Sequence, residues 1–387
     1  MKRDYQTIIL GLGGLGSAAM YWLARRGGDV LGLEQFEIDH GRGGSQDHSR
    51  IIRLSYHTPG YVELAKAAYA TWAEVEADAG EQLVYRTGGL DLWPAAPAYP
   101  MSDYTGSMDA CGVVYERLDA RDVMRRWPQF RLTEDVTGIY QAQSGIATPN
   151  KSNAAHRRLA LQYGAAMRDR TPVEAVRPVG DELEVMAGGE IYRCGHLIVA
   201  AGAWSNRVLA HFNRRLHLTV TQEQVTYYAS PDVDQFRPDR FPVWIWMDEP
   251  SFYGFPVFGE PGPKVAQDVG GEPVTPETRT FEPNAATLAR TEAFLARVLP
   301  GVLGRQIYTK TCLYDLPPDR NFVLCSLPEQ PNVSLAIGAG HAYKFASLIG
   351  RILSDLALDG ATAYDISPFH IDRPILLEQN PTLNFMC

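Results

Sequence analysis

The sequence lacks a membrane-crossing segment and a secretion signal. Its 387 residues contain no apolar run near the roughly 18 residues that a membrane helix needs, and no cleavable apolar core follows the first basic residues. The five cysteines are odd in number and show no C-x-x-C spacing, so no disulfide framework is predicted. We therefore expect a soluble, cytoplasmic protein with no membrane partner.

Metal-binding signatures and excess positive charge are lacking as well. The nine histidines include no H-E-x-x-H motif and no tight His/Cys cluster, so no metal is assigned. The chain carries 36 Lys and Arg against 45 Asp and Glu, and this net charge of −9 disfavours a nucleic-acid partner. Hydrophobic residues make up 45% of the chain, enough for one large core or two ordinary ones.

The first forty residues contain the most informative pattern. Residues 5–10 form an apolar run of strand length, residues 17–26 have helical periodicity, and residues 30–33 are a second apolar run. The turn at residues 11–16 reads Gly-Leu-Gly-Gly-Leu-Gly. In this strand–turn–helix–strand context, a G-x-G-x-x-G motif predicts a dinucleotide site.

Each residue of this motif has a physical reason. Gly11 permits the tight turn, Gly13 lets the backbone approach a pyrophosphate, and Gly16 lets the helix pack against the strand. The N-terminus of the helix then faces the phosphates. Glu34, 18 residues beyond Gly16, can accept hydrogen bonds from a ribose and would repel a 2′-phosphate. FAD and NAD both fit this unit.

The rest of the chain favours FAD. A loop at residues 41–49 follows the first unit, in place of a regular run of further strand–helix units. Strands of the same apolar kind return at residues 196–201 and 333–337, each before a glycine-containing turn, and the second precedes a helix from 343 to about 358. Between these pieces, aromatic alternation such as that around Trp244 predicts strands of a different sheet.

These patterns predict an α/β fold with a Rossmann-like FAD-binding domain interleaved with an antiparallel-sheet substrate-binding domain. We expect the first domain from residues 1–84, 145–218 and 312–387, and the second from residues 85–144 and 219–311. No internal repeat or low-complexity tract is visible.

Ordered motifs over nearly the whole chain resemble the monomeric sarcosine oxidase family of FAD-dependent amine oxidoreductases, which includes N-methyltryptophan oxidase and the pipecolate oxidases. A series of ordered motifs is far more specific than any one of them. The matching segments are residues 11–16 with Glu34, 49–53, 126–128, 197–204, 253–256, 312–314, 340–345 and 364–369.

The resemblance implies a two-lobed flavoprotein with FAD tethered by a thioether to Cys312. A thiolate is a strong nucleophile, and cationic neighbours lower its pKa. A lone cysteine is otherwise a small buried apolar residue, and Cys325 is interpreted in that way.

Basic residues also match functional positions of the family. Arg50 corresponds to an active-site arginine beside the flavin, and Arg53 and Lys344 correspond to the pair that holds the substrate carboxylate. A guanidinium fork can bind a carboxylate in bidentate fashion. Gly340 and Lys344 also belong to the segment that the resemblance places against the cofactor.

Three further residues match the family's catalytic centre. Lys264 corresponds to a lysine over the flavin that activates oxygen, because a nearby cation stabilises the superoxide formed from O₂. Tyr253 and Tyr314 correspond to residues of the substrate pocket, and Tyr314 is assigned a catalytic part. Without the resemblance, an aromatic residue on a strand is more often part of the core.

The chain departs from the sarcosine oxidases where substrate is chosen. Asp268, assigned a catalytic part, and Gln46 stand where those enzymes carry histidine. His341 lies in a loop one residue shorter, a form similar to the imino-acid oxidase of the nikkomycin pathway. Trp244 stands where pipecolate oxidases carry a bulky aromatic residue. We therefore expect a substrate bulkier than sarcosine.

The expected function is oxidation of the C–N bond of a small secondary amino acid, N-methylated or cyclic, to an imine. O₂ would be reduced to hydrogen peroxide by a monomeric enzyme. The alternatives are a pipecolate or cyclic imino-acid oxidase, a flavin dehydrogenase that uses an electron carrier, and a flavoprotein that only binds FAD. Arg53, Lys264 and Lys344 argue against the last, because a pure binder does not need them.

Overall fold

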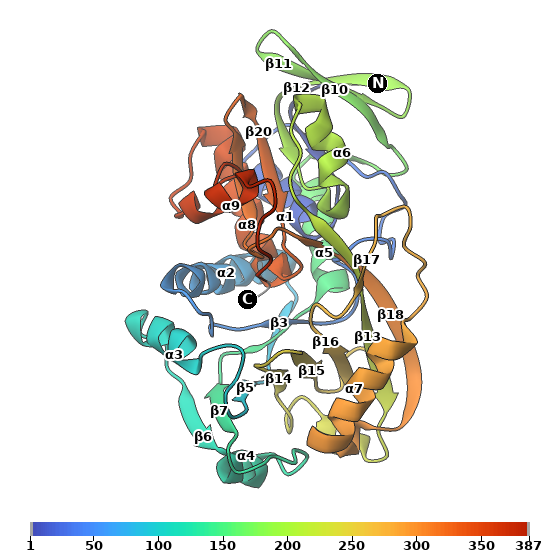
Figure 1. Cartoon of the computed structure of the whole chain (residues 1–387). Helices are drawn as coiled ribbons and strands as arrows, with labels where there is room; N and C mark the ends of the chain where they lie inside the picture. The colour runs from blue at the N-terminus through green and yellow to red at the C-terminus, as the bar shows by residue number, and fades with distance from the viewer. Residues whose placement is uncertain (1–2, 385–387) are drawn as a thin grey trace.

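The computed structural model describes residues 3–384. Residues 1–2 and 385–387, which belong to the predicted FAD-binding domain, therefore lie outside the described residues, and so does Cys387. Two large sheets form two lobes, one in the upper and one in the lower half of Figure 1. Segments from the beginning, middle and end of the chain meet in the upper lobe. The predicted mixed α/β fold is confirmed.

Eight strands form the upper sheet: β1 Asp4–Leu10, β2 Val30–Leu33, β9 Ala166–Arg168, β10 Val173–Val179, β11 Glu182–Ala187, β12 Glu190–Val199, β19 Val323–Leu327 and β20 Gln330–Ile337. Five of them run parallel in the order β20-β12-β1-β2-β9. The other three extend this core in antiparallel fashion. The strands predicted in these regions are confirmed.

Three neighbouring parallel strands end at one edge of this sheet. Leu10 of β1 pairs with Val199 of β12, and Val199 pairs with Leu335 of β20. The glycine motif after β1 therefore meets the turns at residues 202–204 and 338–340. In parallel sheets, ligands bind at the carboxyl ends of the strands.

Helix α1 Gly14–Arg25 lies between two other helices of the upper lobe, α5 Pro149–Gln162 and α8 Ala346–Asp359. Most of its residues are buried because it has neighbours on several sides. The predicted helix at residues 17–26 is confirmed, although it begins at Gly14. The predicted helix at 343–358 begins as a 3₁₀ turn, η5 Ala342–Phe345, and then continues as α8.

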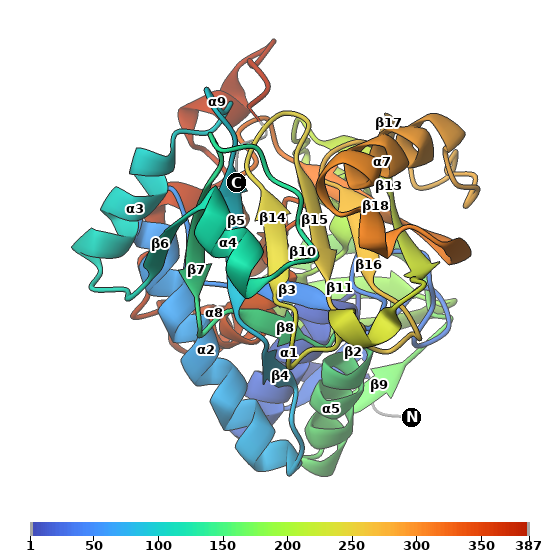
Figure 2. The same ribbon diagram turned by 90° about the horizontal axis from the view of Figure 1, so that it is seen from below.

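Nine strands form the lower sheet: β5 Gly89–Trp93, β6 Glu116–Asp119, β7 Thr137–Gln141, β13 Thr219–Ala229, β14 Val243–Trp246, β15 Phe252–Phe255, β16 Lys264–Gln267, β17 Glu272–Pro273 and β18 Arg305–Leu316. Its pairs are antiparallel except β5 with β14, which run parallel. Figure 2 shows β14, β15 and β16 side by side, with α7 Ala285–Val298 packed near β16.

A small sheet lies between the lobes (Figure 1) and consists of β3 Arg50–Ile52, β4 Val84–Arg86 and β8 Gly145–Ala147. The remaining α-helices of the described chain are α2 Pro59–Ala79, α3 Met101–Ala110, α4 Ala120–Arg126, α6 Ser205–Leu209 and α9 Pro374–Leu377. None of the helices within residues 3–384 is long and apolar enough to cross a membrane.

Two of the predicted domain boundaries fall inside strands. The division between residues 311 and 312 cuts β18, so Cys312 lies on a strand of the lower sheet. The division between residues 84 and 85 cuts β4. The proposed division into two interleaved domains otherwise follows the two large sheets and stays a prediction.

Candidate active site

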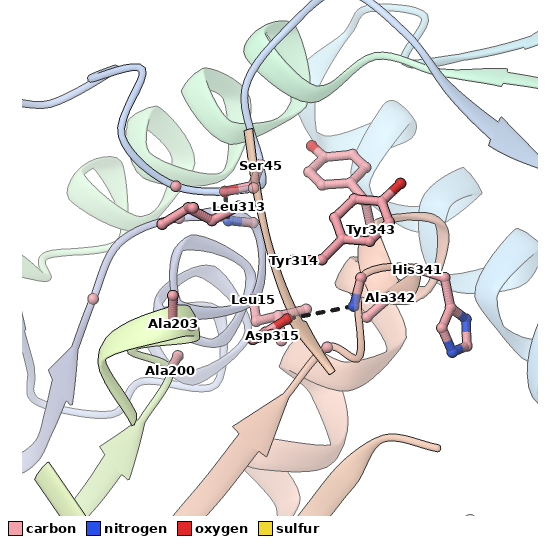
Figure 3. A pocket seen from close by; sticks show the side chains of 18 of the residues that line it. Leu15, Ser45, Ala200, Ala203, Leu313, Tyr314, Asp315, His341, Ala342 and Tyr343 are labelled. Atoms are coloured by element: carbon pink, nitrogen blue, oxygen red, sulfur yellow. Dashed lines mark hydrogen bonds between the residues drawn. The ribbon is translucent and has the colours of Figure 1, made fainter. Parts of the chain in front are cut away.

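A cavity follows the edge where β1, β12 and β20 end, and it continues to β14, β15 and β18 of the lower lobe. Figure 3 shows part of it, with Leu313, Tyr314 and Asp315 of β18 near His341 and Ala342. The predicted site residues that line it are Gly11, Gly13, Glu34, Arg50, Arg53, Tyr253, Asp268, Tyr314, Gly340, His341 and Lys344. The other four, Gly16, Trp244, Lys264 and Cys312, do not line it.

The glycine motif shapes one end of the cavity. Gly11 has a φ of 91°, in the region that favours glycine, and a Cβ on Gly16 would lie 1.8 Å from the carbonyl oxygen of Gly11. Ser45 closes over the start of α1, where its Oγ accepts a hydrogen bond from the backbone N–H of Gly14 at 2.9 Å. This wall is therefore bare backbone that a ligand can approach closely.

Glu34 lies at the same end. Its carboxylate accepts hydrogen bonds from the backbone N–H groups of Leu12 at 2.9 Å and Phe36 at 3.1 Å, and His40 Nε2 lies 3.4 Å away. Burial raises the pKa of Glu34, but the interactions with His40 and the two N–H groups outweigh it, so the pKa lies below its ordinary value. Glu34 is an ionised hydrogen-bond acceptor.

The turn after β20 forms another wall. Gly340 has a φ of 74°, and a Cβ there would lie 2.5 Å from the Tyr314 ring. Its N–H donates to Asp315 Oδ1 at 3.3 Å, the contact dashed in Figure 3. Burial raises the pKa of Asp315 to about 6. This wall is thus built from backbone, one tyrosine ring and one buried acid.

Cys312 is buried on β18, two residues before Tyr314, and is 8% exposed. Its neighbours in sequence, Leu313 and Tyr314, line the cavity together with Tyr253 of β15. Burial raises the pKa of the Cys312 thiol to about 11, while the Arg50 charge acts to lower it. The thiol is therefore protonated at neutral pH in this environment.

Arg50 is held by backbone carbonyl oxygens. Its guanidinium donates to the carbonyl oxygens of Ser49 at 2.9 Å, Gly44 at 2.9 Å and Gln46 at 2.7 Å. Its Nη1 also lies 3.7 Å from Asp47 Oδ2. These contacts fix a positive charge at the cavity wall, next to the loop that closes over α1.

Arg53 and Lys344 come from segments far apart in the sequence and converge on Tyr56. The guanidinium carbon of Arg53 lies 5.1 Å and Lys344 Nζ lies 5.7 Å from the centroid of its ring. Arg53 Nη1 is 3.5 Å from Asp91 Oδ1. Burial raises the pKa of Asp91, and the Arg53 charge opposes that rise. Two cations at one wall can receive a ligand carboxylate.

Asp268 forms a salt bridge with Arg320, with 2.8 Å between Oδ2 and Nη2, and both residues line the cavity. Burial raises the pKa of Asp268, but the Arg320 charge and hydrogen bond bring it below its ordinary value. His341 Nε2 lies 2.9 Å from the Arg320 carbonyl oxygen, and its ring stacks on Phe322 at 4.7 Å between centroids. The charge of Asp268 is therefore balanced within the protein.

Lys264 lies directly behind the cavity wall. Its Nζ donates to Asp47 Oδ2 at 3.0 Å and to the Ser49 carbonyl oxygen at 2.8 Å, and it lies 4.0 Å from the ring centroid of Phe255, a lining residue. Burial lowers the pKa of Lys264 to about 8, while the Asp47 charge acts to raise it. Burial raises the pKa of Asp47, but Lys264 and Arg50 bring it far below its ordinary value.

The prediction that Trp244 faces the substrate is wrong. Alternate residues of a strand point to opposite faces, and Trp244 points into the lower core, where its ring stacks on Phe294 at 5.9 Å. Its neighbour Ile245 lines the cavity instead. Gln46, which replaces a family histidine, is buried and donates to the Thr311 carbonyl oxygen at 3.1 Å, next to Cys312.

The acids and the arginine that complete these clusters were not predicted from the sequence. Asp91 interrupts an otherwise apolar strand at residues 89–93, and Asp47 lies three residues before Arg50, so both positions carried a signal. Arg320 follows two prolines and an aspartate, a composition that predicts only a turn. Asp315 lies three residues beyond Cys312 and carried no separate signal.

Comparisons with known proteins show the family of the chain. The family described as FAD dependent oxidoreductase matches residues 6–356. A monomeric sarcosine oxidase from Streptomyces avermitilis is 34% identical over 95% of this chain and 97% of its own length. An N-methyl-L-tryptophan oxidase from Escherichia coli is 29% identical over 95% of this chain and 99% of its own length.

A solved structure supports the same assignment. NikD, described as an unusual amino acid oxidase essential for nikkomycin biosynthesis, has a TM-score of 0.84 and 28% identity, and the match covers 95% of this chain and 98% of NikD. L-proline dehydrogenase from P. horikoshii shares the fold, with a TM-score of 0.84 at 19% identity over 96% of this chain and 97% of its own. The chain therefore belongs to the family of FAD-dependent oxidoreductases, together with relatives of the sarcosine oxidase type.

Proposed function

We propose that the chain is an oxidase of a small secondary amino acid, N-methylated or cyclic. The observation that carries this proposal is the convergence of Arg53 and Lys344 on Tyr56, in the cavity that also contains the dinucleotide motif. Two fixed cations suit an anionic substrate, and a flavin in the same cavity suits its oxidation. The relatives named sarcosine oxidase and N-methyl-L-tryptophan oxidase support the same substrate class.

The described residues fit FAD. Any Cβ at Gly11 or Gly16 would clash with backbone, so the wall there admits a pyrophosphate, and Glu34 offers an ionised acceptor for a ribose. Arg50, Gly340 and Lys344 lie farther along the cavity and would hold the rest of the cofactor, with Cys312 bonded to it through a thioether. FAD, when bound, accepts two electrons from the substrate and passes them to O₂.

Arg53 and Lys344 bind the substrate carboxylate and so orient the α C–N bond. The amine must be neutral to release electrons, and the positive charges of these two residues disfavour a protonated amine nearby. The imine product hydrolyses in water, or leaves intact when it is cyclic. Tyr253 and Tyr314 supply the wall between the two lobes.

Lys264 supports the oxygen step, in which O₂ becomes hydrogen peroxide. Asp47 and the Ser49 carbonyl oxygen hold its ammonium group in place, close behind the wall made by Phe255. A positive charge about 7 Å away, on the other side of the Phe255 ring, stabilises a developing superoxide by roughly 2 kcal/mol at an effective dielectric constant of about 20. That energy corresponds to about thirtyfold in rate.

The experiment that tests the function is a substrate screen. The values of kcat/KM, oxygen uptake and peroxide release are measured for sarcosine, N-methylalanine, proline, pipecolate and dimethylamine, the decarboxylated match of sarcosine. We expect peroxide from the amino acids and almost none from dimethylamine. Equal efficiency on sarcosine and dimethylamine contradicts the roles of Arg53 and Lys344. Flavin that bleaches under nitrogen but transfers no electrons to O₂ indicates a dehydrogenase instead.

The same screen ranks the substrates. We expect pipecolate or proline to exceed sarcosine, because each extra buried methylene contributes about 0.8 kcal/mol. Sarcosine as the best substrate contradicts this part of the proposal. We also propose a cytoplasmic, monomeric enzyme, and a size-exclusion mass near twice that of the chain contradicts the monomer.

A further inference from the structure

Glu223 lies directly opposite Cys312 in the lower sheet. Strands β13 and β18 are antiparallel, and their register pairs Glu223 with Cys312 and Thr221 with Tyr314. Directly opposed side chains of an antiparallel pair project from the same face, with Cβ atoms about 4.5–5.5 Å apart. Because Tyr314 lines the cavity, Glu223 and Cys312 lie on the cavity side of the sheet.

The Glu223 carboxylate is buried and held at both oxygens. Its Oε1 accepts a hydrogen bond from Thr221 Oγ1 at 2.6 Å, and its Oε2 accepts one from the Gly270 N–H at 3.0 Å. Glu223 is 4% exposed. Burial raises its pKa to about 7, the Asp268 charge adds to this rise, and the Arg320 charge opposes it. A carboxylate in this environment can accept a proton near neutral pH.

A base is needed at Cys312, because burial holds the thiol pKa at about 11. The charged groups that act most on this thiol are Arg50, Glu223, Asp47 and Arg279. Two of them are acids. Asp47 is bound by Lys264 and Arg50, which bring its pKa far below its ordinary value, so it is a poor proton acceptor. Glu223 is the better acceptor of the two.

We propose that Glu223 is the general base with which the protein attaches FAD to itself at Cys312; this rests on the covalent linkage proposed above. Glu223 takes the thiol proton, and the sulfur bonds to the ring methyl carbon of the flavin. One C–H bond of that methyl breaks, its proton leaves to solvent, and the electron pair reduces the ring. O₂ then takes these two electrons with two protons and becomes hydrogen peroxide, which restores the oxidised flavin.

The test compares the wild type with Glu223→Gln, a substitution of the same shape. Its single carbonyl oxygen can still accept from the Gly270 N–H, while its NH₂ group donates to Thr221 Oγ1, whose hydroxyl can act as acceptor. Apoprotein from riboflavin-limited cells is mixed with FAD in air, and flavin that stays in the acid precipitate is measured over time. General base catalysis contributes about 10²–10⁴-fold. We therefore expect attachment at pH 7 to be at least about a hundredfold slower in Glu223→Gln, while non-covalent FAD binding persists.

The pH profile separates a base from a structural role. In the wild type, the attachment rate should level off above the pKa of Glu223, near 7. In Glu223→Gln, the rate should keep rising about tenfold per pH unit toward the thiol pKa, because only the thiolate attacks. The charged and titratable groups that act on this pair are Asp268, Arg320, Arg50, Asp47, Arg279, Tyr253 and Tyr314, and none of them is expected to change charge near pH 7.

Thr221→Val is the matched control, because it removes a hydrogen bond to the same carboxylate but keeps the acid. It should attach FAD within a few-fold of the wild-type rate. Attachment by Glu223→Gln as fast as by the wild type overturns the proposal, and so does a loss in Thr221→Val as large as that in Glu223→Gln. A wild type that releases all its flavin in acid contradicts the linkage at Cys312 itself, which is a different failure.

Discussion

The two ends of the cavity are built from different materials. At the end that holds the glycine motif, the wall is backbone, and the charged group there, Glu34, is compensated by N–H groups and His40. At the other end, ion pairs form the wall: Arg53 with Asp91, Arg320 with Asp268, and Lys264 with Asp47 behind it. The first end suits a cofactor of fixed shape, whereas the second sets the charge that a reacting molecule meets.

Substitutions that add side-chain volume should therefore impair the first end most, and substitutions that remove a charge should impair the second end most. Gly16→Ala has the largest expected effect. Its Cβ would lie 1.8 Å from the Gly11 carbonyl oxygen, so α1 or the turn must move and FAD should no longer bind. The measurement is flavin absorbance per protein after purification.

Gly60→Ala is the matched control for this change. Gly60 lies on α2, where a Cβ meets nothing within 4 Å, so this variant should keep its flavin. A Gly16→Ala protein that carries a full complement of FAD would show that the close approach of α1 to β1 is not required.

Lys264→Met should slow reoxidation of the reduced flavin by about thirtyfold, with reduction by substrate affected much less. Stopped-flow measurement of the two half-reactions checks this, with Lys66→Met on α2, outside the cavity, as control. In the wild type, reoxidation should decline as pH rises through about 8, because Lys264 then loses its proton. A variant that reoxidises normally but cannot be reduced contradicts the assignment.

Arg320→Met should destabilise the protein by roughly 3 kcal/mol, because it leaves the Asp268 charge without its partner. The pKa of Asp268 is lowered in the folded state, so the pair stabilises the fold above the unfolded-state pKa and loses this effect as pH falls through the folded-state value. Urea unfolding at pH 7 and at low pH measures the difference, which should shrink in acid.

The double variant Arg320→Met/Asp268→Leu should recover most of the lost stability, because the unpaired charge is then removed as well. Arg121→Met, which breaks an exposed pair with Glu134, should change little. If the double variant is no more stable than Arg320→Met, compensation of the Asp268 charge is not the source of the stability that Arg320 contributes.

Trp244→Phe has the smallest expected effect on activity. Because Trp244 packs on Phe294 and not on the cavity, we expect about 1–2 kcal/mol lower stability and kcat/KM within about twofold of the wild type. Ile245→Ala on the cavity face should instead raise KM for a cyclic substrate several-fold. If Trp244→Phe impairs catalysis more than Ile245→Ala does, Trp244 contacts the substrate after all.

The difference between the two ends of the cavity also explains which parts of the site could be predicted from the sequence. The cofactor end follows from local chemistry, because the spacing of Gly11, Gly13 and Gly16 specifies a turn whatever the rest of the chain does. Two charged residues at the other end, Arg53 and Asp268, were identified by resemblance to a family. Their partners, Asp91 and Arg320, were not, since pairs made across the fold leave no fixed spacing in the sequence.

Two other findings needed the strand geometry itself. Aromatic alternation at residues 243–247 indicates a strand but does not say which face meets the cavity, and the family match favoured the wrong face for Trp244. Glu223 lies 89 positions before Cys312, and only the antiparallel register of β13 and β18 brings the two together.

The position of Cys312 on β18 has a mechanical consequence. The glycine turn that would seat the cofactor belongs to the upper lobe, whereas β18 is hydrogen-bonded into the lower sheet. Once the proposed thioether forms, the cofactor links the two lobes covalently. A hinge motion between the lobes must then stretch or bend this thioether link, so we expect the two lobes of the FAD-bound enzyme to move as one rigid unit.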